Sequence, residues 1–324
     1  MSRSFAALSI VAVLMTASAC GRIARDVKLV SDLKANIDEL WQEPSAIARR
    51  DLFLGPGGSE MRPKNSTFTF VARDMGGWSP GFDVRDQEGV EWSVKLGPEA
   101  QSEVVSSRIL WAMGFHQPPT YYLERWTLTG AESGEQPAGR FRPSLEQQRV
   151  VGEWSWYENP FVGSRPLGGL IVANLILNSW DWKTSNNKIY ELAEPVNGVR
   201  RWFVVRDVGA SLGKTTYPPI LKWFRLRGFG QGTRNDLAGF EEQGFITRLH
   251  DEGQPEFDYQ GIYRDVIETV TLEDVRWACG LLNRLTDQQW RDAFRAGGYN
   301  QEQTGRFVTK IKAKIRQGLD ITAR

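Results

Sequence analysis

Five residues in the middle of the 324-residue chain have types and spacing that can carry out chemistry. Asp181, Lys183 and Asn186 follow an apolar stretch, and Asp207 and Gly209 follow a short β-like segment. A carboxylate can orient an attacking hydroxyl group and accept its proton, while carboxylate and amide oxygens are hard ligands that hold magnesium across phosphates. These residue types therefore favour magnesium-dependent phosphoryl transfer.

The composition excludes several other chemistries. The chain has two histidines, His116 and His250, and two cysteines, Cys20 and Cys279. Too few ligands are present for a Cys/His zinc site or a disulfide scaffold, and no Ser-His-Asp or Cys-His arrangement is indicated. Forty Lys and Arg residues against 39 Asp and Glu residues leave a formal net charge of +1. Nucleic-acid binding through overall basicity is therefore not expected.

Secondary-structure signals predict which elements position these residues. Residues 167–178 form a mostly apolar stretch that is typical of a helix, and residues 188–192 and 201–205 read as short strands. A hairpin formed by these two strands would bring Asn186 and Asp207 to one side of the same crevice.

The chain upstream is rich in strand signals. Residues 82–85 and 92–96 alternate on either side of a turn and predict a hairpin, after a strand that begins at residues 68–71. Residues 100–114 read as a helix ended by a glycine, and residues 121–128 read as one further strand. The first half is therefore predicted to be a small sheet with one helix.

Further features in this half fit the same chemistry. Gly76, Gly77 and Gly81 lie between two predicted strands, where backbone N–H groups can cover phosphates. Lys95 ends a strand of alternating pattern, and Glu103 falls early in the next predicted helix.

In this order, the motifs resemble the protein-kinase-like superfamily. They are more similar to its atypical branch, which includes phosphoinositide kinases, HipA-type toxin kinases and secretory-pathway kinases. Asp181, Lys183 and Asn186 have the spacing of a kinase catalytic loop, and Asp207 and Gly209 stand where the metal-binding D-x-G motif belongs. The Leu-Gly pair that follows in this branch is matched by Leu212-Gly213.

The resemblance covers about residues 65–215. It implies an α+β class and a bilobal protein-kinase-like fold. The β-rich N-lobe would comprise residues 62–128 and the mainly helical C-lobe residues 129–324, with the nucleotide in the cleft between them.

The resemblance also implies roles for individual residues. Asp181 would be the catalytic base, and Lys183 would contact the transferred phosphoryl group. Asn186 and Asp207 would be the metal ligands. Asn187 stays open as an alternative ligand, because the motif allows a one-residue slip.

Lys95 and Glu103 would form the ion pair that clamps the nucleotide beneath the glycine-rich loop. The chain departs from the family pattern at two points. Trp180 and Trp182 flank Asp181, where the family has His or Arg, and the glycine-rich loop fits no fixed pattern.

Residues 1–19 read as a signal peptide. Arg3 precedes an apolar run too short to span a bilayer, and small residues precede Cys20. The junction resembles a bacterial lipoprotein cleavage site, so Cys20 would carry a lipid and anchor the exported protein to a membrane, in the periplasm or at the outer membrane. Plain secretion and an uncleaved anchor are the alternatives. Residues 20–61 would form a stem, with an amphipathic helix at residues 27–42.

The C-terminal half carries further predictions. Thr271 and Thr286 begin capping-box patterns at the starts of two helices. The last helix has an apolar face that would dock on the core, formed by Val308, Ile311, Ile315 and Leu319. A basic loop that could attract an acidic or phosphorylated substrate contains Lys222, Arg225, Arg227 and Arg234.

The function that follows from these patterns is an exported phosphotransferase that uses ATP with Mg (or Mn). Its acceptor would be a hydroxyl group of a protein or a small molecule. Two alternatives use the same site: a catalytically weak kinase-fold binding or scaffold lipoprotein, and a protein nucleotidyltransferase. The expected partners are a nucleotide, an unknown acceptor and, through Cys20, a membrane; no nucleic acid is expected.

Overall fold

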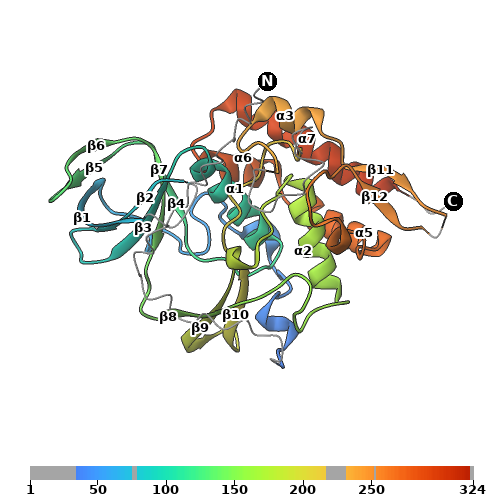
Figure 1. The fold of residues 1–324 in the computed structure, drawn as a ribbon, viewed down its shortest axis with the longest axis horizontal. Helices are drawn as coiled ribbons and strands as arrows, with labels where there is room; N and C mark the ends of the chain where they lie inside the picture. Colours follow the sequence, from blue (N-terminus) through green and yellow to red (C-terminus); the bar gives the residue numbers. More distant parts are fainter. Residues whose placement is uncertain (1–33, 75–78, 217–230, 252, 322–324) are drawn as a thin grey trace, which may run out of the picture.

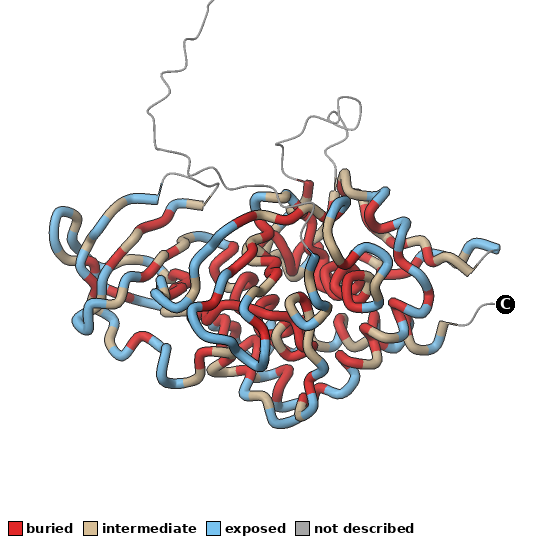
Figure 2. Tube along the Cα trace, turned by 90° about the horizontal axis from the view of Figure 1, so that it is seen from below, coloured by how far each residue is buried: buried red, intermediate tan, exposed pale blue. Residues whose placement is uncertain are grey.

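The structure is a computed structural model that describes residues 34–74, 79–216, 231–251 and 253–321. It places a β-rich part at the N-terminal end and a mainly helical part at the C-terminal end (Figure 1). This arrangement confirms the predicted α+β class and is consistent with a kinase-like bilobal fold. Figure 2 shows that the buried segments gather in the middle of the molecule.

The N-lobe is built on a seven-stranded sheet with the strand order β4-β7-β3-β2-β1-β5-β6. Its elements are β1 (Thr67–Asp74), β2 (Gly81–Arg85), β3 (Glu91–Leu96), α1 (Glu99–Ala112), β4 (Tyr121–Leu123), β5 (Trp126–Thr129), β6 (Gly134–Gln136) and β7 (Gly139–Pro143). The predicted hairpin is confirmed as β2 and β3, which pair antiparallel. Because β7 pairs with β3, the sheet extends past residue 128.

Alternating side chains build the core of this sheet. Phe68, Trp92, Trp126 and Phe141 come from β1, β3, β5 and β7, and all four are buried. The rings of Trp126 and Phe141 meet edge to face, with centroids 5.3 Å apart. Large rings on one face therefore hold together strands that lie far apart in the sequence.

Helix α1 ends at Ala112, two residues before the glycine predicted to close it, Gly114. This glycine has φ +102°, and a Cβ atom there would lie 2.2 Å from the main-chain oxygen of Gln42. Only glycine accepts both the left-handed backbone and this close approach.

The C-terminal part contains a three-stranded sheet, a short hairpin and six α-helices among the described residues. The first half of it comprises β8 (Gln148–Glu153), α2 (Arg165–Ile176), β9 (Asn187–Val196), β10 (Val199–Val205) and α3 (Leu237–Glu242). It continues with β11 (Ile246–Leu249), β12 (Pro255–Phe257), the single turn α4 (Arg264–Ile267), α5 (Leu272–Asn283), α6 (Asp287–Ala296) and α7 (Gln301–Asp320). The apolar helix and the strand pair predicted around the motif residues are confirmed as α2, β9 and β10.

Two predictions about secondary structure are wrong. Residues 121–128 form two strands rather than one, because β4 pairs with β7 while β5 pairs with β1, so the chain must bend between them. Within the described part of the predicted stem helix, residues 34–42 contain only the 3-10 turn Ile37–Glu39. The Gln42 N–H donates to the Gly114 oxygen at 3.1 Å and the Trp41 indole nitrogen to the Met113 oxygen at 2.7 Å, so this segment is bonded to the end of α1.

The predicted helix starts in the C-terminal half are confirmed. Thr271 and Thr286 each form a reciprocal capping box, with Asp274 and Gln289. The described part of the chain has no helix long and apolar enough to cross a membrane. Residues 1–33, including the predicted signal peptide and Cys20, lie outside the described residues.

Helix α7 docks on the core through Ile311 and Ile315, as predicted, but it also buries a lysine. The Lys314 amine donates to the Asn178 side-chain oxygen at 2.6 Å and to the main-chain oxygen of Ile176 at 3.2 Å. Ile176 is the last residue of α2, and Asn178 lies two residues beyond it. Its ammonium position lies 4.6 Å from the centre of the Phe240 ring. Burial holds the pKa of Lys314 well below its ordinary value.

The lowered pKa of Lys314 predicts a pH-dependent contribution to stability. The unfolded chain binds a proton there up to pH about 10.5, whereas the folded chain releases it at a lower pH, so stability rises with pH in that window. We expect the free energy of unfolding of the natural protein, relative to Lys314→Met, to increase by about 1 kcal/mol per pH unit within it. Urea unfolding of both proteins from pH 7 to pH 10 measures this difference; parallel curves would contradict it.

Candidate functional site

Strands β9 and β10 bring Asn186 and Asp207 together. Val205, the last residue of β10, is opposite Asn187 in the antiparallel register. At the open end of this ladder, the main-chain oxygen of Asn186 accepts hydrogen bonds from the N–H groups of Arg206 at 2.9 Å and Asp207 at 3.3 Å. The juxtaposition predicted from the strand pattern is therefore present in the backbone itself.

The segment around Asp181 lies directly before this hairpin. The Asn186 side-chain amide donates to the main-chain oxygen of Asp181 at 2.7 Å, which closes the loop between the two residues. The Asp181 carboxylate is 2.9 Å from the Lys183 ammonium group. Asp181 has a mostly buried side chain, whereas the side chain of Lys183 is 57% exposed. A carboxylate and an exposed cation therefore lie side by side in this loop.

Asn187 is placed differently from Asn186. It is fully buried, and its side-chain nitrogen donates to the main-chain oxygen of Trp154 at 3.0 Å. Asn186, in contrast, is bonded to Asp181 through its side chain and to the Asp207 N–H through its main-chain oxygen. The geometry therefore favours Asn186 over Asn187 as the residue that accompanies Asp207.

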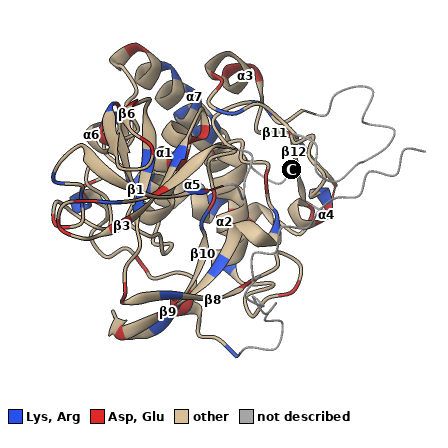
Figure 3. Ribbon diagram, turned by 60° about the vertical axis from the view of Figure 1, so that its left-hand side comes forward, with Lys and Arg blue, Asp and Glu red and all other residues tan. Residues whose placement is uncertain are grey.

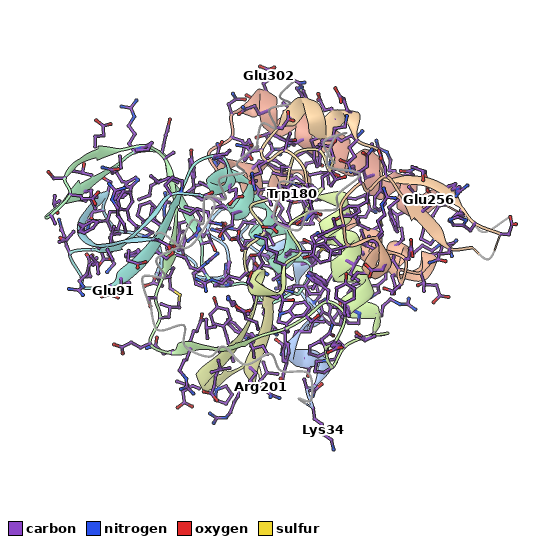
Figure 4. The ribbon with its side chains drawn as sticks, viewed as in Figure 1. Lys34, Glu91, Trp180, Arg201, Glu256 and Glu302 are labelled. Atoms are coloured by element: carbon purple, nitrogen blue, oxygen red, sulfur yellow. The ribbon has the colours of Figure 1, made fainter. Side chains whose placement is uncertain are left out.

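Hydrogen bonds also join the residues that precede Asp181 to those that follow Asp207. The Trp180 N–H donates to the Ala210 oxygen at 3.1 Å, and the Leu212 N–H donates to the Leu177 oxygen at 2.9 Å. Asn178 adds a side-chain hydrogen bond to the Gly213 oxygen at 2.7 Å. Figure 4 shows Trp180 near the centre of the molecule. The residues before Asp181 and those after Asp207 are thus tied together.

Lys95 links this assembly to the N-lobe. Its Nζ lies 2.7 Å from an Asp207 carboxylate oxygen and 3.0 Å from Glu103. A third carboxylate, that of Glu99 at the start of α1, lies 3.3 Å away. The predicted Lys95–Glu103 pair is therefore present, and it joins β3 and α1 to the segment after β10.

Four charged residues that were not predicted for this site also belong to it: Glu99, Arg140, Arg142 and Arg234. Arg140 and Arg142 of β7 both reach Glu103, with Arg140 Nε at 2.9 Å from it. Glu99 also accepts a hydrogen bond from Ser79 at 3.1 Å and pairs with Arg234. The sequence pattern could have identified the two arginines as a pair. Residues two apart in a strand face the same side, and Phe141 between them faces the core.

We call these seven residues the charged cluster: Lys95, Glu99, Glu103, Arg140, Arg142, Asp207 and Arg234. Figure 3 shows acidic and basic positions close together around α1 and the neighbouring strands. Four cations against three carboxylates leave the cluster with one excess positive charge. An excess positive charge among poorly exposed groups favours the binding of an anion.

The pairings fix the protonation states at the centre of the cluster. Burial opposes the charged form of Lys95, but the carboxylates of Glu103 and Asp207 outweigh it and raise its pKa above the ordinary value. Burial likewise opposes ionisation of Asp207, but Lys95 lowers its pKa below the ordinary range. Burial also acts on Glu103, where Arg140 and Lys95 prevail and lower the pKa. All three groups are therefore charged at neutral pH.

Gly81 has a structural reason for being glycine. It begins β2, and a Cβ atom there would lie 2.6 Å from the main-chain oxygen of Val94 on β3. Gly76 and Gly77 lie outside the described residues, as do Lys222, Arg225 and Arg227 of the predicted basic loop.

The oxygen atoms of Asp207 and Asn186 fit a hard divalent cation such as magnesium. The Asp207 side chain is 39% exposed, and the Asn186 amide uses its nitrogen for the Asp181 contact, which leaves its oxygen as the ligand atom. No cluster of three or more His, Cys, Asp and Glu side chains suited to a metal occurs within the described ranges. A site with one carboxylate and one amide is of the kind that shares magnesium with phosphates.

An open cavity lies elsewhere among the described residues. Its volume is about 1090 Å³, and residues of the β11–β12 hairpin and α4 line it, among them Arg248, Glu256 and Arg264. None of its lining residues belongs to the charged cluster. We therefore assign the candidate site by the chemistry of its side chains rather than by the size of a cavity.

Glu103 should be essential for stability, because three cations share its buried carboxylate. We expect Glu103→Gln to lower the free energy of unfolding by about 3–5 kcal/mol, since it leaves buried charges without a partner. Glu191→Gln is the matched control, because Glu191 pairs with Arg149 at the surface and should cost less than about 1 kcal/mol. Urea unfolding measures both; equal losses would refute the central role of Glu103.

Comparison with known proteins shows a likeness among solved structures. No protein-family profile and no curated protein sequence matches the chain. Among solved structures, the chain is similar to the crystal structure of a Helicobacter pylori proinflammatory kinase, CtkA, at 12% sequence identity and a TM-score of 0.44. The match covers 78% of this chain and 95% of that chain.

Proposed function

We propose that the protein is a Mg-ATP-dependent phosphotransferase with a kinase-like fold, acting on a hydroxyl group of a protein or a small molecule. The observation that carries this proposal is the position of Lys95, which contacts Glu103 on α1 and Asp207 beyond β10 at the same time. Asn186 and the Asp181 loop lie directly beside Asp207. The proposed lysine, metal ligand and base thus come from three segments of the chain, and Asn186 joins the segment of Asp181 to that of Asp207.

In this proposal, Lys95 contacts the phosphates of the nucleotide. Its ammonium group is held by carboxylates from two sides, so its direction is set before a ligand binds. The excess positive charge of the charged cluster supports the same role, because a polyphosphate would compensate it.

Asp207 and Asn186 would hold magnesium or manganese. When bound, the metal neutralises charge that develops on the phosphate oxygens. The contribution of the chain is to keep the carboxylate of Asp207 ionised through its contact with Lys95.

Asp181 is proposed as the base. Its carboxylate accepts the proton of the acceptor hydroxyl as that oxygen forms a bond to the γ-phosphorus, while the bond between the γ-phosphorus and the β–γ bridging oxygen breaks and ADP leaves. Lys183, now paired with Asp181, is placed to contact the transferred phosphoryl group. Its long and exposed side chain allows it to change partners.

The cellular setting is proposed from the sequence alone. The small residues before Cys20 support export and lipidation of that cysteine, which would anchor the enzyme to a bacterial membrane.

The first prediction of this proposal concerns nucleotide binding. ATP with magnesium at about 100 times its Kd should stabilise the full chain by about 2.7 kcal/mol. Asp207→Asn should remove this gain, because it removes the charge of the metal ligand while keeping its shape. Asp251→Asn, an exposed position on the β11–β12 turn, is the control and should keep the gain. Thermal melting with and without ATP measures the effect, and a natural protein unaffected by ATP would refute the proposal.

The second prediction separates turnover from binding. Asp181→Asn should lower kcat by about 10²- to 10⁴-fold, as expected for loss of a general base, and should leave ATP affinity within about two-fold. Intact-mass measurement of the protein or of an added acceptor, after incubation with ATP and magnesium, follows transfer. A nucleotide adduct in place of a phosphate would indicate nucleotidyl transfer, and unimpaired transfer by Asp181→Asn would contradict its role.

A further inference from the structure

Arg234 reaches the charged cluster from a segment that contains none of the motif residues. It lies shortly before α3, and its Nε is 2.5 Å from an oxygen of Glu99. Its guanidinium group also lies over the ring of Trp180, 4.6 Å from the ring centre. The side chain is 16% exposed, so both contacts are largely shielded from water.

The segment that carries Arg234 is firmly attached on both sides. The Trp180 indole donates to the Thr233 oxygen at 2.9 Å, just before the arginine. Directly after it, the Asn235 N–H donates to the Ser211 oxygen at 3.0 Å, and the Asn235 side chain donates to Gln101 of α1 at 2.9 Å. The position of Arg234 is therefore built into the fold.

Glu99 connects Arg234 to the rest of the site. One of its oxygens pairs with Arg234, and the other receives Lys95 at 3.3 Å and the Ser79 hydroxyl at 3.1 Å. Lys95 and Arg234 thus meet on a single carboxylate. Since Trp180 directly precedes Asp181, Arg234 connects the lysine end of the site to the loop of the proposed base.

We propose that Arg234 binds a phosphate group of the nucleotide, with Glu99 occupying its guanidinium when no phosphate is present. The inference rests on the proposed function. A guanidinium offers a planar fork of donors that matches a phosphate in a bidentate manner, and stacking on an aromatic ring fixes the plane of that fork. Glu99 and a phosphate then compete for the same two cations, Lys95 and Arg234.

This competition predicts that substitutions of Arg234 and of Glu99 change the affinity for ATP in opposite directions. Arg234→Met should weaken the binding of ATP with magnesium by about 10- to 100-fold, the loss typical of a charged hydrogen bond, and should leave adenosine binding within two-fold. Glu99→Gln should tighten ATP binding several-fold, because it removes the competing negative charge. Arg234→Lys, which keeps the charge but loses the fork, should fall between Arg234→Met and the natural protein.

Titration calorimetry with ATP, adenosine and inorganic tripolyphosphate measures these affinities. Arg306→Met is the matched control, because Arg306 pairs with Glu241 on the surface of α7 and should change none of them. Equal weakening of ATP and adenosine by Arg234→Met would indicate a structural role and overturn the inference. Tighter ATP binding in Arg234→Met would also overturn it, by showing that the arginine blocks the site.

The failure of the proposed function gives a different pattern. Tripolyphosphate binding that depends on Arg234, without transfer from ATP, would support the phosphate site and refute the phosphotransferase. A natural protein that binds neither ATP nor tripolyphosphate would overturn both.

Discussion

The contact of Lys95 with carboxylates from two other parts of the chain is the interaction on which the candidate site depends. Glu103 comes from α1, and Asp207 follows β10, so this one ammonium group connects a strand, a helix and a loop. Buried ion pairs are stable only when each charge has partners, and Arg140 and Arg142 complete the set around Glu103. The charges of the site therefore depend on one another. Loss of the Glu103 carboxylate leaves several cations without a partner in surroundings of low dielectric constant.

The balance of charge in this assembly bears directly on function. An excess of one cation is tolerated at a site that is completed by an anionic ligand, and the hard oxygen ligands beside it suit magnesium rather than zinc. Phosphoryl transfer needs neither histidine nor cysteine, which agrees with the scarcity of both residues in this chain. A catalytically weak binding protein would use the same contacts for the nucleotide, so turnover at Asp181 is what distinguishes the two functions.

The loop that carries Asp181 is supported from the opposite side by the C-terminal helix. Lys314 of α7 binds the Asn178 oxygen, and Asn178 in turn binds the Gly213 oxygen. This chain of hydrogen bonds connects a helix at the end of the sequence to both segments of the site. The cost of burying an amine is offset by these two acceptors, which an apolar residue would leave without a donor.

The sequence by itself determined most of the elements that carry the site and the spacing of the motif residues. Period-two alternation, the glycine at position 114 and the capping patterns at Thr271 and Thr286 act over a few residues, so local physics was sufficient to predict them. Only the tertiary structure decided which asparagine stands beside Asp207, that Arg140 and Arg142 converge on Glu103, that Lys314 is buried, and that the described residues 34–40 form no long helix. Each of these outcomes depends on the register and packing of segments that are distant in sequence. A local pattern contains no information about which of several charged or amide side chains will meet across such a distance.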